Sequence, residues 1–112
     1  MSKIQDMIDQ IEEQQQECKE MLRKLDYLEE ELYWHSHKRL DAYLSDWKSE
    51  IKGERLLGLL EEKEDKLCNG KYNERQFFSE CNSAISKMLI ELERTKEKYA
   101  GEFNTAIGVY KK

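Results

Sequence analysis

The sequence predicts an all-α protein, and three observations support this fold class. Apolar residues recur at intervals of three and four along much of the chain, which is the spacing of one face of a helix. None of the 112 residues is proline, so no proline interrupts a long helix. Charged and hydrophobic residues each make up 38% of the chain, a balance too polar for a thick globular core and too patterned for disorder. We therefore expect a single helical domain over residues 1–112.

The first helix is expected over residues 3–52, because two apolar stripes follow one another there without a break. The first stripe has one polar member, Gln14, and consists of Ile4, Met7, Ile11, Gln14, Cys18, Met21, Leu25, Leu28 and Leu32. The stripe then changes phase and continues through Tyr33, His37, Leu40, Leu44, Trp47 and Ile51. At a rise of ~1.5 Å per residue, such a helix would be about 75 Å long.

Two break signals follow the first helix. Gly53 is suited to a bend or a helix end, and Asn69-Gly70 is the stronger break because both residues tolerate a left-handed backbone. Residues 54–68, with leucines on one side, are expected to form a short extra helix at the turn or to prolong the first helix past a kink. The turn itself is placed at residues 69–72.

The last helix is expected over residues 73–108. Asn73 and Gln76 have the spacing of a capping box, in which each side chain accepts a hydrogen bond from the backbone of the other. The apolar stripe consists of Phe78, Cys81, Ile85, Met88, Leu92, Thr95 and Tyr99, and Phe77 and Leu89 widen it.

Together these helices predict an antiparallel helical hairpin whose two stripes bury each other. The first arm is longer than the clean stripe of the last helix, so part of it should overhang with its stripe uncovered. An uncovered apolar stripe usually marks a surface that binds a partner.

No catalytic, cofactor or metal site is expected, and an enzyme is not predicted. His35 and His37 point in nearly opposite directions on a helix, so they cannot hold one metal ion together. The carboxylates are many, but a helical hairpin offers little concavity in which their pKa values would shift. Cys18, Cys68 and Cys81 form no C-x-x-C pair and are expected to be reduced thiols.

Charge and hydropathy exclude two classes of partner. The net charge is −5 with acids and bases mixed, so nucleic-acid binding is not expected. No apolar run approaches the length that spans a bilayer, so membrane insertion is not expected either. The first residues are acidic and amphipathic where a signal peptide would be basic and then apolar. We expect the protein in the cytoplasm, with any export by a route that uses no cleaved signal.

Aromatic residues near the middle of the chain are the candidates for contacting a protein partner. Trp34 lies off the apolar stripe beside Tyr33, and aromatic residues dominate interface hot spots, which makes Trp34 the best single candidate. Core or turn packing is the alternative role for this tryptophan. The predicted partner-binding set is Trp34, Trp47, Tyr33, Leu25, Leu28 and Leu32.

Trp47 and Gly53, near the chain midpoint of a small helical hairpin, give a resemblance to the Trp-x-Gly superfamily of type VII secretion systems. The spacing here is W-K-S-E-I-K-G, and the export motif after the second helix is missing, because Phe103 stands four residues after Tyr99. The chain looks most similar to the small helical proteins encoded beside LXG effectors. That resemblance implies a targeting factor or chaperone that binds the helical N-terminal domain of an effector, with either a second small helical factor or the effector itself supplying the export signal.

Two hypotheses for function follow. The first is a non-catalytic binding module that packs beside a helical effector domain. The second is a structural coiled-coil protein that self-associates as a homo-oligomer through the same stripe. Gln14 and Cys18 are weak choices for a self-paired seam, and the phase change after Leu32 spoils a long regular coiled coil, so the first hypothesis is slightly favoured.

Overall fold

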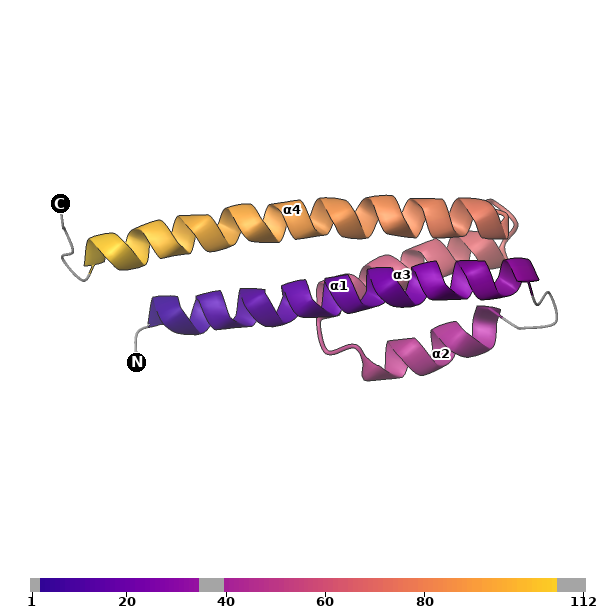
Figure 1. The fold of residues 1–112 in the computed structure, drawn as a ribbon, viewed down its shortest axis with the longest axis horizontal. Helices are drawn as coiled ribbons and strands as arrows, with labels where there is room; N and C mark the ends of the chain where they lie inside the picture. The colour runs from indigo at the N-terminus through magenta and orange to yellow at the C-terminus, as the bar shows by residue number, and fades with distance from the viewer. Residues whose placement is uncertain (1–2, 35–39, 107–112) are drawn as a thin grey trace.

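The computed structural model describes residues 3–34 and 40–106, and of residues 102–106 it describes the backbone alone. Within these ranges the chain forms helices and no strands, which confirms the all-α class. The four helices are α1 (Lys3–Trp34), α2 (Leu40–Glu50), α3 (Glu54–Cys68) and α4 (Glu74–Ala106) (Figure 1). The short helix expected over 54–68 corresponds to α3, and it is separate from the helices on either side.

The prediction of one continuous helix over residues 3–52 is wrong. Helix α1 ends at Trp34, and α2 runs back along α1 in the opposite direction (Figure 1). Lys24 Nζ lies 3.3 Å from Glu50 Oε1. On one straight helix these residues would be about 39 Å apart. The reversal lies between Trp34 and Leu40, so His37 falls outside the described residues.

The phase change after Leu32 gives the physical reason for this reversal. Two stripes that lie on different faces of one straight helix cannot both turn toward the same core. Folding back lets α2 bury its own stripe, and Leu40 and Leu44 are only 5% and 1% exposed.

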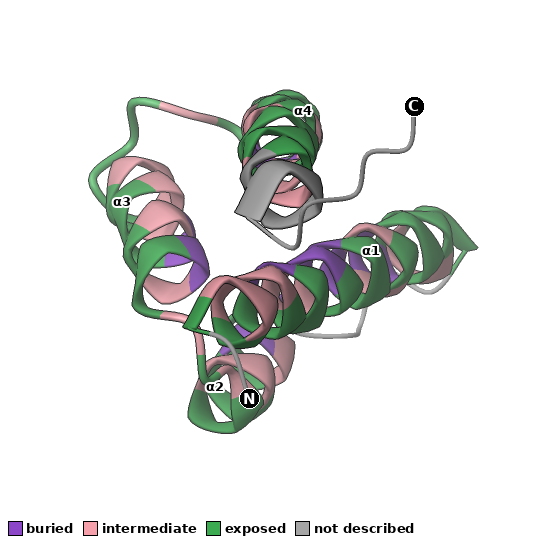
Figure 2. Cartoon of the chain, turned by 90° about the vertical axis from the view of Figure 1, so that its left-hand side faces the viewer, coloured by how far each residue is buried: buried purple, intermediate pink, exposed green. Residues whose placement is uncertain are grey.

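Helices α1 and α4 pack against each other and run in opposite directions (Figure 1). They have 32 and 33 residues, so the predicted overhang of a longer first arm is also wrong. Helix α3 packs against α4, and α2 lies on the side of α1 away from α4 (Figure 2). The described residues therefore form four helices around one core, where the sequence predicted two long arms with a possible short helix at the turn.

The core collects the apolar stripes of all four helices. Its buried members are Ile11, Cys18, Met21, Leu25, Leu28, Leu40, Leu44, Leu56, Leu60, Phe77, Phe78, Cys81, Ile85, Met88 and Leu92. The polar member of the α1 stripe is Gln15, which is 6% exposed, and not the predicted Gln14, which is half-buried. Gln15 Nε2 donates a hydrogen bond of 3.0 Å to Glu93 Oε1 of α4, so its amide is satisfied at the boundary of the core.

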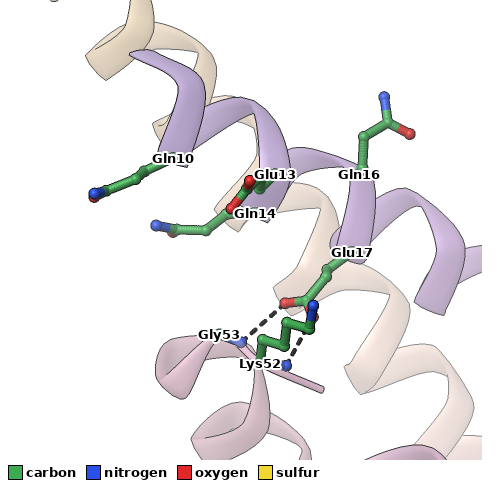
Figure 3. A pocket seen from close by; sticks show the side chains of 7 residues that line it. All are labelled: Gln10, Glu13, Gln14, Gln16, Glu17, Lys52 and Gly53. Carbon is green, nitrogen blue, oxygen red and sulfur yellow. Dashed lines mark hydrogen bonds between the residues drawn. The ribbon is translucent and has the colours of Figure 1, made fainter. Parts of the chain in front are cut away.

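Glu17 of α1 holds the start of α3. Its carboxylate accepts hydrogen bonds from the backbone N–H groups of Lys52 (2.7 Å) and Gly53 (3.0 Å), as Figure 3 shows. Gly53 is the N-cap of α3 and makes no side-chain cap, so Glu17 supplies an acceptor that the local sequence lacks. A Cβ atom on residue 53 would lie 2.9 Å from Glu17 Oε1, so glycine permits this close approach.

The start of α4 agrees with the predicted capping box. The N–H of Gln76 donates to Asn73 Oδ1 at 2.8 Å, and the N–H of Asn73 donates to Gln76 Oε1 at 3.0 Å. Gly70 has a φ of +84°, which is the left-handed conformation expected at the preceding break.

Candidate partner-binding surface

The most exposed aromatic side chains of the described residues lie at the C-terminal end of α1. Tyr33 is 78% and Trp34 is 69% exposed. Their rings meet edge to face, with centroids 5.0 Å apart and an interplanar angle of 89°. Such an arrangement is favoured between aromatic rings, so each side chain limits the freedom of the other.

A third exposed aromatic residue extends this surface along α1. Tyr27 is 58% exposed and precedes Trp34 by seven residues, or about two helical turns. Arg23 precedes Tyr27 by four residues, so all three residues lie on one side of the helix. The exposed surface therefore continues from the end of α1 toward α2.

Where α2 lies against α1, the two helices enclose an aromatic groove of about 360 Å³. We use the name "aromatic groove" for the space lined by Arg23, Lys24, Tyr27, Tyr43 and Trp47. The rings of Tyr43 and Trp47 are tilted by 55° with centroids 6.0 Å apart, and both residues also pack against the core. Lys24 Nζ lies 5.9 Å from the centroid of the Trp47 ring, within the range of a cation–π contact.

Two ion pairs connect α2 to the helices beside it. Lys48 of α2 pairs with Glu64 of α3, and both side chains are mostly buried, at 26% and 18% exposure. Lys24 pairs with Glu50 near the other face of the same helix. An exposed pair such as Lys24–Glu50 contributes about 0–1 kcal/mol, whereas each fully buried leucine contributes about 1.5–3 kcal/mol, so Leu40 and Leu44 hold α2 more firmly than that pair does.

The predicted partner-binding residues divide into two groups. Tyr33 and Trp34 are exposed together, and Trp47 is half-buried at the groove. Leu25 and Leu28 are 2% and 0% exposed.

The assignment of these leucines to a partner surface therefore needs correction. Their helical spacing marks the core of this chain, and α4 is packed along the same helix. Leu32 is partly buried against that core.

Sequence reasoning missed Tyr27 and Arg23, although the seven-residue separation of Tyr27 and Trp34 was a signal that could have found them.

The two residues behind the family resemblance lie in different parts of the fold. Trp47 is in α2, and Gly53 precedes α3 beside Glu17. The stretch between them contains the end of α2 and the connection to α3, and does not itself form the turn between two long arms.

The two buried thiols, Cys18 and Cys81, are unreactive at neutral pH. Burial raises the pKa of Cys18 to about 11 and that of Cys81 to about 12; Glu17 also raises the pKa of Cys18, whereas Lys63 partly opposes the rise at Cys81. Both are therefore protonated at neutral pH, where the thiolate is the reactive form. Cys68, at the end of α3, is exposed.

The described residues contain no group of three or more His, Cys, Asp or Glu that could hold a metal ion. The groove beside Gly53 is lined by the amides and carboxylates of α1, and the Glu17 carboxylate is already bonded to the backbone there (Figure 3). No helix in the described part of the chain is both long and apolar enough to cross a bilayer.

Comparison of the chain with known proteins found no relative. The chain matches no protein-family model, no curated protein and no solved structure.

Proposed function

We propose that this chain is a non-catalytic helical binding protein that docks against another helical protein through the end of α1. The observation that carries the proposal is the exposure of Tyr33 and Trp34, at 78% and 69%, on a chain whose other large apolar residues mostly gather in one core. Aromatic residues dominate interface hot spots, because they bury a large area at a small cost in side-chain entropy. The contact between the two rings lowers that cost further.

The partner proposed is the helical N-terminal domain of a type VII effector of the LXG class. The resemblance to small LXG-associated proteins suggests this partner, and an exposed aromatic pair at the end of a helical bundle suits packing beside further long helices. In this role the chain acts as a targeting factor or chaperone in the cytoplasm. A second small helical factor completes the complex if neither protein carries the export signal.

The test is co-expression with the N-terminal domain of an effector encoded nearby, followed by size-exclusion chromatography with light scattering. We expect a complex of defined stoichiometry. Trp34→Ala should weaken it by about 30-fold or more, the loss expected of a hot-spot residue. Ile90→Ala is the matched control, because Ile90 is also apolar and 54% exposed but lies on α4. Both variants should keep the circular dichroism spectrum of the parent.

Two results would count against the proposal. A homo-oligomer that ignores the effector domain would favour a self-associating scaffold. A complex that forms equally well with Trp34→Ala and Ile90→Ala would show that the end of α1 is not the interface.

A further inference from the structure

The aromatic groove between α1 and α2 combines three aromatic side chains with two basic ones. We infer that it receives an apolar side chain flanked by a carboxylate, presented by a helix of the protein partner. This inference rests on the proposed function and deepens it, since it adds a second contact and names the chemistry of the partner at that contact.

The walls of the groove are suited to an apolar side chain. Tyr27 comes from α1, and Tyr43 and Trp47 come from α2, so rings approach the space from two helices. The rings of Tyr43 and Trp47 are held by their contact with each other and with the core. A pocket with fixed aromatic walls loses little freedom when a side chain enters it, which is the condition for an effective anchor site.

The charges of the groove favour an acidic partner. Its two charged lining residues, Arg23 and Lys24, are both basic, although the whole chain carries a net charge of −5. Arg23 pairs with Glu20 through side chains that are 70% and 49% exposed. Exposed pairs of this kind are worth little, so Arg23 can exchange Glu20 for a partner carboxylate at small cost. Lys24 remains with Glu50 and with the Trp47 ring.

The position of the groove favours a helix as the element that presents this side chain. Tyr27 and Trp34 lie on one side of α1, seven residues and about 10 Å apart along the helix axis. An amphipathic helix laid along α1 places anchors at the same interval of two turns. One helix of the partner can therefore contact Trp34 and fill the aromatic groove together.

The test uses two small probes that carry opposite charges at the end of a phenylalkyl chain, phenylbutyrate and phenylbutylamine. Binding is followed by the indole N–H signal of Trp47 in two-dimensional nitrogen–proton NMR spectra, assigned with a Trp34→Phe variant. We expect a saturable shift with phenylbutyrate and weaker binding of the amine. The net charge of −5 would by itself favour the amine, so a preference for the carboxylate reports the groove.

Variants of the groove locate the binding. Arg23→Gln should weaken phenylbutyrate by about two- to fivefold, the range expected of one exposed ion pair. Arg94→Gln is the matched control, because it makes the same change of net charge at an exposed position of α4. Tyr27→Ala should weaken both probes, whereas Trp34→Ala should leave both unchanged.

The inference is overturned if phenylbutyrate gives no saturable shift, if the amine binds as well, or if Arg23→Gln behaves like Arg94→Gln. Its failure is distinct from failure of the proposed function. If the complex with the effector domain depends on Trp34 but neither probe binds in the aromatic groove, only the inference about the groove is rejected. Probe binding in the groove, found together with a complex indifferent to Trp34→Ala, rejects only the assignment of the α1 end.

Discussion

The link between Glu17 and Gly53 allows a prediction about stability that depends on two residues at once. Glu17→Ala removes a carboxylate that accepts two backbone hydrogen bonds, at 2.7 and 3.0 Å, from the start of α3. The loss of a helix cap costs about 0.5–2 kcal/mol. Because two N–H groups lose a charged acceptor, we expect ~1–2 kcal/mol in the free energy of unfolding.

Gly53→Ala should destabilise the protein only while Glu17 is present. The added Cβ would lie 2.9 Å from Glu17 Oε1, so the carboxylate must move and its hydrogen bonds must lengthen. The φ and ψ of Gly53 are −77° and 121°, which alanine adopts without strain. In the Glu17→Ala background there is no carboxylate for the new Cβ to meet. Gly53→Ala should then leave the free energy of unfolding unchanged or raise it slightly, because alanine lowers the conformational entropy of the unfolded chain.

The assay is a double-mutant cycle by urea unfolding, followed by circular dichroism at the helical signal. The losses in the free energy of unfolding caused by the two single variants should sum to more than the loss caused by the double variant. The difference, which is the coupling energy, should be about 0.5–1.5 kcal/mol. Glu13→Ala is the control, because Glu13 lines the same groove one turn earlier, while the Lys52 and Gly53 N–H groups bond to Glu17. Additive effects, or a Glu13→Ala variant as unstable as Glu17→Ala, would refute the assignment of Glu17 as the cap of α3.

Three further outcomes can be measured on the protein alone. Leu25→Ala should lower the free energy of unfolding by about 2–5 kcal/mol, whereas Trp34→Ala should change it by less than about 0.5 kcal/mol, because the first side chain is buried and the second is exposed. The hydrogen bond from Gln15 is the main cause that lowers the pKa of Glu93, so Gln15→Ala should raise that pKa in an NMR titration. Because the pKa of Glu93 is lower in the folded than in the unfolded state, its ionised carboxylate stabilises the fold, and this stabilisation is lost as the pH falls through the folded pKa. A thiol reagent should modify Cys68 at once and the two buried thiols only after unfolding, and a fast reaction of all three in the native protein would contradict the burial described.

The periodicity of the sequence was sufficient to identify most of the core. Leu28, Ile85 and Met88 lie on the predicted stripes and are buried, because a helix must turn its apolar face away from water wherever that face goes. Local signals also placed the start of the last helix, since the capping box between Asn73 and Gln76 involves residues three positions apart.

The reversal after α1 could not be derived in the same way. Periodicity shows which face of a helix is apolar, but it does not show which element covers that face. One helix whose stripe changes phase and two helices joined by a reversal of the chain therefore have the same spacing pattern. The change at Leu32 was visible, but the choice between the two depends on contacts such as those that bury Leu40 and Leu44 in the core, which join residues far apart in sequence. For the same reason the sequence predicted Leu25 as a partner contact, when the core of the chain itself buries this side chain.

The pairing of α1 with α4 has a consequence for the order in which the chain can fold during synthesis. Gln15 and its partner Glu93 are separated by 78 residues, so α1 leaves the ribosome long before the helix that covers it exists. At about 5–20 residues per second, translation of that stretch takes roughly 4–16 s, far longer than a helix needs to form. During this interval the apolar stripe of α1 is open to any other helix within reach, and a partner or chaperone made nearby can bind the nascent chain before α4 competes for the same face.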